Sequence, residues 1–168
     1  MQLKQVQIQL SEPTERGRLY YYQDLEIEKN ILFIQNNIRR RRSYSINISC
    51  LVILGIDDNH LLKSVEIIYP QRAWEIESSP ATIRDSFAAD IVIPNLSSKT
   101  TNIELPVVVL TDHQKSYAQV SIGTLDEDAE WIALSNQCFA LIKESLLQGF
   151  FISLGRSDVE NNPDFIEE

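Results

Sequence analysis

The stretch from Thr124 to Gly149 places the strongest constraint on the fold that this sequence predicts. Thr124 and Glu127 form a capping box at its start, and Gly149 ends the pattern as a helix-stopping residue. At about 1.5 Å per residue, a helix over 125–148 would be about 36 Å long, enough to cross a whole sheet. Its apolar residues recur at helical spacing, namely Trp131, Leu134, Cys138, Leu141, Ile142 and Leu146.

A second helix is predicted near the N-terminus, where Ile27, Ile31, Ile34 and Ile38 form one stripe behind a possible N-cap. Four consecutive arginines, Arg39, Arg40, Arg41 and Arg42, would then occupy its C-terminal end, where the helix dipole favours cations. Residues 20–28 also contain strand-favouring tyrosines, so a strand remains an alternative there.

Alternating or apolar runs predict strands over most of the remaining chain. We expect them at 3–10, 43–56, 62–69, 89–94, 105–110, 117–123 and 150–154, with a short helix beginning at Ser79 and Pro80. Polar turns near 56–60 and 111–116 make two of these pairs hairpins. The predicted class is therefore α+β, a mostly antiparallel sheet covered on one face by the long C-terminal helix. Residues 1–155 would form one domain, and 156–168 an acidic, mobile tail.

Charge is distributed unevenly over the 168 residues, whose net charge is −9. Residues 1–42 hold eight basic and five acidic side chains, a net of +3, so that the rest carries −12. An acidic chain disfavours general phosphate binding, so nucleic acid is not the expected partner. Cys50 and Cys138 both lie in apolar patterns and are expected to be reduced core thiols, with a single buried disulfide between them as the alternative.

Local sequence motifs of common enzymes are missing. There is no G-x-G-x-x-G, no G-x-x-x-x-G-K-[ST], no G-x-S-x-G and no C-x-x-C, and no cofactor is expected. The remaining candidates for metal binding are in two predicted turns, Asp57, Asp58 and His60 in one and Asp112 and His113 in the other. Their convergence could hold a divalent metal. Asp and His are also ordinary turn formers, which explains the same residues without a site.

Arg39–Arg42 allow three interpretations: a solvated helix end, a contact to an acidic protein or to a second copy of this chain, or a nucleic-acid contact. The run stands alone, without the broad basic face of nucleic-acid modules, which disfavours the third.

The sequence favours a non-catalytic, cytoplasmic protein that binds another macromolecule through an acidic face, in an accessory, chaperone-like or toxin-neutralising role. The N-terminal residues lack the apolar region of a signal peptide, and no apolar run approaches the length of a membrane span. The alternative is a small-ligand-binding or metal-dependent hydrolytic enzyme, with its polar groups at the turns around His60 and His113.

Overall fold

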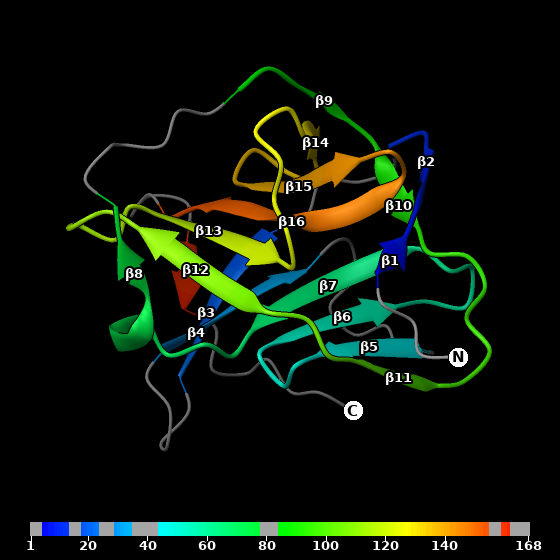
Figure 1. Ribbon diagram of the computed structural model, residues 1–168, viewed down its shortest axis with the longest axis horizontal. Helices are drawn as coiled ribbons and strands as arrows, with labels where there is room; N and C mark the ends of the chain where they lie inside the picture. Colours follow the sequence, from blue (N-terminus) through cyan, green and yellow to red (C-terminus); the bar gives the residue numbers. More distant parts are fainter. Residues whose placement is uncertain are drawn as a thin grey trace.

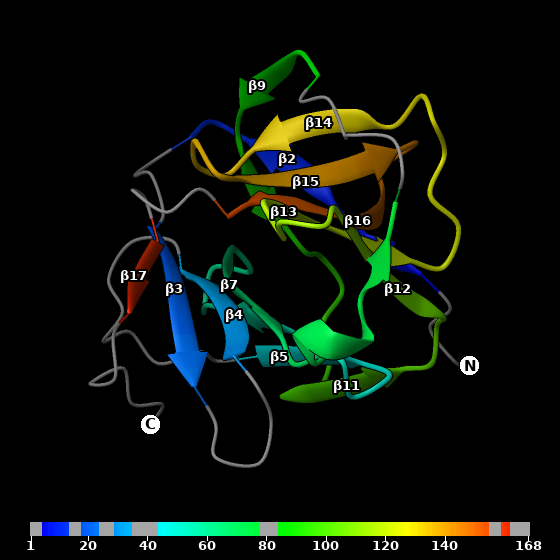
Figure 2. The same cartoon turned by 90° about the vertical axis from the view of Figure 1, so that its left-hand side faces the viewer.

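The computed structural model describes residues 5–13, 18–23, 29–34, 44–77, 84–154 and 159–161, and within these ranges nearly all regular structure is β-strand. The one helical element among them is a single 3-10 turn, η1 (Gln71–Ala73). Two large sheets face each other, as Figure 1 and the perpendicular view in Figure 2 show. The α+β prediction is therefore wrong, and the protein is a β fold of two layers.

The first large sheet contains eight strands, most of them from the C-terminal half of the chain. Its central strand β16 (Leu146–Ser153) pairs with β15 (Cys138–Lys143) on one side and with both β13 (Tyr117–Ile122) and β1 (Val6–Gln7) on the other. Outside these lie β12 (Val107–Thr111) and β8 (Glu75–Ile76) at one end, and β14 (Glu130–Ala133) and β9 (Ser86–Ala88) at the other.

The second large sheet contains seven strands. In order across the sheet they are β11 (Thr100–Ile103), β5 (Tyr44–Ile48), β6 (Val52–Ile56), β7 (Leu62–Ile67), β4 (Lys29–Ile34), β3 (Arg18–Gln23) and β17 (Val159–Asn161). A separate pair, β2 (Gln9–Ser11) and β10 (Asp90–Val92), completes the fold. Most pairs are antiparallel, but β11–β5, β12–β8, β14–β9 and β17–β3 are parallel.

The main core lies between the two large sheets. Alternate residues of β5 and β6, such as Ile46 and Leu54, are fully buried there, as are Val120 and Phe150 from the opposite sheet. This burial on one face follows from the two-residue period of strands. A second apolar cluster covers the outer face of the first sheet, and it contains Tyr117, Ala129, Trp131, Phe139, Leu141 and Phe151.

The predicted long helix over 125–148 is wrong, because this stretch forms a loop, β14, β15 and the start of β16. Both faces of these strands are buried: Trp131 and Phe139 belong to the outer cluster, while Ile132 and Ala140 belong to the main core. Strands buried on both faces lose their alternation and become continuous apolar runs. In such a run, some apolar residues necessarily lie three or four positions apart, so their helical spacing does not indicate a helix.

The predicted N-terminal helix is also wrong over its described part. Residues 18–23 and 29–34 form the antiparallel pair β3–β4, as the alternative strand interpretation of residues 20–28 allowed in part. Arg39–Arg42 lie outside the described residues, as does the start of the predicted helix at Ser79 and Pro80. The predicted tail contains β17, and the rest of it is not described.

The predicted strand over 43–56 contains a turn that the sequence analysis missed. Ser49 and Cys50 adopt left-handed conformations with φ of 52° and 60°, and β5 reverses into β6. The Asn47 side chain accepts the Cys50 N–H at 2.9 Å, which fixes the turn. Cys50 is therefore exposed, and its assignment to the core is wrong. Cys138 is fully buried, although on a strand and not on a helix.

Candidate functional site

The β6–β7 turn contains Asp57, Asp58 and His60. One carboxylate oxygen of Asp57 accepts the backbone N–H groups of Asn59 at 2.9 Å and Leu61 at 3.0 Å. The His60 Nδ1 lies 3.1 Å from the carbonyl oxygen of Ile93, and the ring packs edge-on against another aromatic ring. The buried carboxylate thus closes its own turn, as the turn-forming interpretation expects.

Asp112 and His113 lie in the β12–β13 turn. The Asp112 carboxylate accepts hydrogen bonds from the hydroxyl of Ser116 and, at 2.8 Å, from its N–H, and these bonds lower the pKa of the carboxyl group. Figure 1 shows the β6–β7 and β12–β13 turns at opposite ends of the molecule. The structure does not bring the two turns together, and within the part of the chain it describes no three His, Cys, Asp or Glu side chains gather as metal ligands.

A different group of charged residues comes together on the first sheet. Asp85 lies before β9, and four acids follow one another in and after the β13–β14 loop. We call this group the acidic surface and define it as Asp85, Asp126, Glu127, Asp128 and Glu130. All but Asp126, which is half-buried, are exposed. The capping-box interpretation of Glu127 does not predict this group, although the run of acids after Gly123 is a signal for it in the sequence.

A β-bulge holds one end of this loop. Leu141 pairs with Gly149 and Ile142 with Leu147, which leaves Gln148 without a partner on β15. The Gln148 side chain instead accepts the Asp126 N–H at 3.0 Å and donates to the Asp126 carboxylate at 2.7 Å. The irregularity in the central strand therefore fixes where the acidic loop begins.

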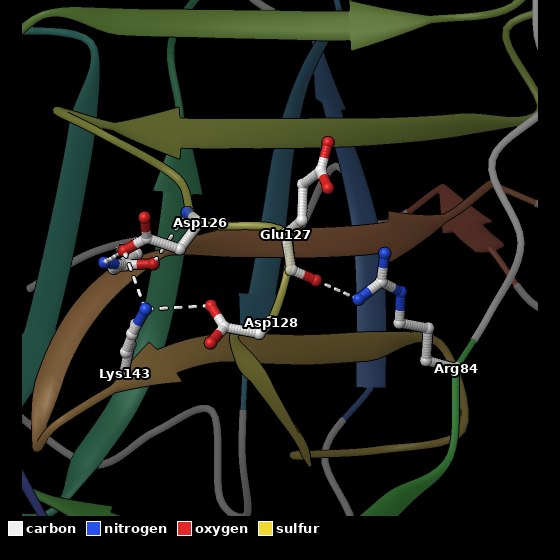
Figure 3. A network of polar contacts seen from close by, with 6 residues as sticks. Arg84, Asp126, Glu127, Asp128 and Lys143 are labelled. Carbon is white, nitrogen blue, oxygen red and sulfur yellow. Dashed lines mark hydrogen bonds and ion pairs between the residues drawn. The ribbon is translucent and has the colours of Figure 1, made fainter.

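Two cations hold the rest of the loop, as Figure 3 shows. The Lys143 ammonium donates to Asp128 at 2.9 Å and lies 3.9 Å from Asp126. The hydrogen bond with Lys143 lowers the pKa of the Asp128 carboxyl, and the same bond raises the pKa of the lysine. The Arg84 guanidinium donates to the backbone carbonyl of Glu127, so the Glu127 carboxylate takes no part in this contact. With five acidic and two basic side chains, the local net charge is negative.

The loop also has an apolar underside. Leu125 packs against the outer cluster, and Ala129 belongs to it. Within the cluster the Trp131 and Phe151 ring centroids are 4.9 Å apart, and the Tyr117 and Phe151 rings stack at 5.3 Å. Aromatic packing of this kind is well defined in geometry. The carboxylates are thus presented on a rigid base.

A cavity of about 300 Å³ lies near the acidic loop, at the start of β16. Its walls include Gln5, Leu105, Ile122, Thr124, Leu146 and Gln148, and no charged side chain or histidine lines it. The volume is at the lower end for small-molecule sites. The lining contains one hydroxyl, that of Thr124, and no acid or base that could activate it.

The chain matches no protein-family model, and no curated protein is significantly similar to it. Among the described residues, no helix has the length and apolar character needed to cross a membrane.

Proposed function

We propose that this chain is a non-catalytic, cytoplasmic protein-binding domain that contacts a basic partner protein through the acidic surface. The observation that supports this proposal is the loop itself, which Gln148, Lys143 and Arg84 hold over a packed aromatic base and which exposes the carboxylates of Glu127 and Asp128. Groups fixed before binding lose less conformational entropy when a partner arrives.

The charge of the acidic surface selects the kind of partner. Exposed carboxylates attract Lys and Arg side chains, accelerate encounter with a basic protein and repel phosphate backbones. An accessory, chaperone-like or toxin-neutralising role would each use such a surface. Two free thiols, Cys50 and Cys138, support a reducing compartment such as the cytoplasm.

The proposal is tested by capturing partners from the lysate of the source organism with three forms of the chain. The site variant is Glu127→Lys/Glu130→Lys, and its matched control is Glu75→Lys/Glu104→Lys, which changes the net charge equally at exposed residues elsewhere. We expect one stoichiometric basic protein on the wild type and the control, less of it at higher salt, and none on the site variant.

Retention of the same partner by the site variant would refute the acidic surface as the contact, and so would the absence of any protein on the wild type. An Arg39–Arg42→Ser variant in the same experiment tests the second predicted contact. Loss of partner in that variant alone would assign binding to the arginines instead of the acidic surface.

A further inference from the structure

Strand β9 is an open edge beside the acidic surface. It ends the eight-stranded sheet, pairing in parallel with β14, and on its other side none of the described strands pairs with it. All three of its residues are exposed, and the Phe87 side chain is 52% exposed. A large aromatic side chain at an unpaired sheet edge is a feature that proteins usually cover.

The hydrogen bonds of β14 show which groups of β9 are free. The Leu134 N–H donates to the Cys138 carbonyl at 2.9 Å, so residues of β14 at even positions face β15. Odd positions, Trp131 and Ala133, then face β9. In the parallel register of β14 and β9, this turns the main chain of Phe87 towards β14. The N–H and C=O groups of Ser86 and Ala88 are therefore directed at the open edge.

Two carboxylates of the acidic surface lie at the start of this edge. Ser86 is paired with Trp131, so the preceding residues Asp85 and Glu130 lie side by side. The contact between the Arg84 guanidinium and the Glu127 backbone carbonyl ties the acidic loop to the same segment, while the Glu127 carboxylate points away from Arg84 (Figure 3). Because strand side chains alternate, Asp85 and Phe87 share one face of the edge strand. Acidic and apolar positions thus follow each other at a spacing of two residues.

Two other described edges, β11 and β8, fit a guest strand less well. The Lys99 and Ile103 carbonyls accept the N–H groups of Ser45 and Ser49 from the neighbouring chain segment. The N–H and C=O groups of Thr100 on β11 therefore face outwards. The outward carbonyl of Thr100 already accepts the Ser98 hydroxyl at 3.1 Å, and the exposed side chains of β11 are polar. The two-residue strand β8 has Ile76 exposed but is shorter than β9.

We propose that the partner adds an extended basic segment to the open edge of β9 as a further strand. The segment forms main-chain hydrogen bonds with Ser86 and Ala88, places an apolar side chain beside Phe87 and places Lys or Arg beside Asp85 and Glu130. Strand addition obtains affinity from main-chain bonds and specificity from alternate side chains. This inference rests on the proposed function, since it specifies how the partner of the acidic surface is held.

The test uses a seven-residue peptide with blocked ends, Lys-Thr-Val-Thr-Lys-Thr-Val, in which lysine and valine alternate along one face of the strand. A second peptide has the same composition with the two lysines contiguous. Binding is measured at low ionic strength by isothermal titration calorimetry. Ser86→Pro removes one outward N–H, and Thr100→Pro removes the corresponding N–H on β11. Proline is tolerated at edge positions whose N–H faces solvent.

We expect the alternating peptide to bind the wild type more tightly than the contiguous one. Ser86→Pro should weaken binding about 3- to 10-fold, the effect of losing one net hydrogen bond, while Ser86→Ala and Thr100→Pro bind as the wild type. If Ser86→Pro does not fold, the same question is answered on the wild type, where hydrogen exchange of the Ser86 and Ala88 amides should slow when the alternating peptide is bound.

The two proposals fail in different ways. Equal binding of both peptides, with unchanged exchange at Ser86 and Ala88 and loss of binding in Glu127→Lys/Glu130→Lys, would overturn strand addition and leave the acidic surface as a purely electrostatic contact. No binding of either peptide at low ionic strength would overturn both. Association of the chain with itself through β9 would overturn the assignment of the edge to a separate basic partner.

Discussion

The substitution Gly149→Ala tests the packing of the central strand. Gly149 lies in β16, opposite Ser121 of β13 and Leu141 of β15. A Cβ atom at this position would lie 2.0 Å from the carbonyl oxygen of Val120 and 3.1 Å from its carbonyl carbon. Those are main-chain atoms, so no side chain can rotate away. The two strands would have to separate by about 1 Å, the shortfall from normal close packing.

Inserting an extra methyl group into a packed interior usually costs about 1–3 kcal/mol. Here the relief must come from hydrogen-bonded main chain between β13 and β16, so we expect the upper end, about 3 kcal/mol. For a chain of this size, that corresponds to a fall of about 6–12 °C in the melting temperature. Urea unfolding followed by circular dichroism gives the free energy of unfolding, and calorimetry gives the melting temperature.

Gly123→Ala is the matched control. Gly123 has a φ of 73°, and the nearest atom to its Cβ would be a Leu105 methyl carbon at 3.7 Å. Its cost is only that of a left-handed alanine, about 1–2 kcal/mol. A loss at Gly149 below about 1 kcal/mol would refute the packing argument.

Three further predictions concern the turn, the thiols and the loop. Asp57→Ala should lower the free energy of unfolding by about 1–3 kcal/mol in urea titrations, because two N–H groups of its turn lose their acceptor; a smaller effect than that of Asp57→Asn would contradict this. A thiol reagent at mildly alkaline pH should modify only Cys50 in the native protein and both cysteines in urea, since burial raises the pKa of the Cys138 thiol. Lys143→Met should lower the urea midpoint between about pH 4 and pH 10. This difference should shrink as the pH falls through the lowered pKa of Asp128 or rises through the raised pKa of Lys143, and a difference independent of pH would exclude the ion pair as its cause.

Strands whose two faces differ could be predicted from the sequence. The hairpin of β12 and β13 and that of β6 and β7 occur where alternating runs and polar turns indicated them. These segments have one face in the main core and the other more exposed, as in β13, where the half-buried Gln119 and Ser121 alternate with buried apolar residues. Alternation of this kind leaves a period of two in the sequence.

The missed hairpins lack the usual signals for a turn. Glu144 and Ser145 join β15 to β16 with φ values of 52° and 62°, and Ser49 and Cys50 turn β5 into β6. Two-residue hairpin turns with positive φ usually contain Asn or Gly. None of these four residues is of that kind, so the sequence gives little sign of the reversal. The resulting uninterrupted patterns were assigned to a helix and to one long strand.

The acidic surface could be predicted only in part. The run from Asp126 to Glu130 is visible in the sequence, but Arg84 and Asp85 come from the segment just before β9, more than 40 positions away. Parallel pairing of β9 with β14 brings them together. Parallel strands are joined by long connections, and a single sequence contains no local pattern that specifies which distant strands will pair.

The position of β16 determines when the chain can fold. It is the last long strand of its sheet, yet β1, β13 and β15 all pair with it. During synthesis, the earlier strands of this sheet leave the ribosome before the strand that joins them exists. Until about residue 153 has emerged, the apolar faces of β13 and β15 and the free edges of both remain exposed. Pairing over such sequence distances is slow, and this interval is when the chain is most exposed to aggregation and most dependent on chaperones.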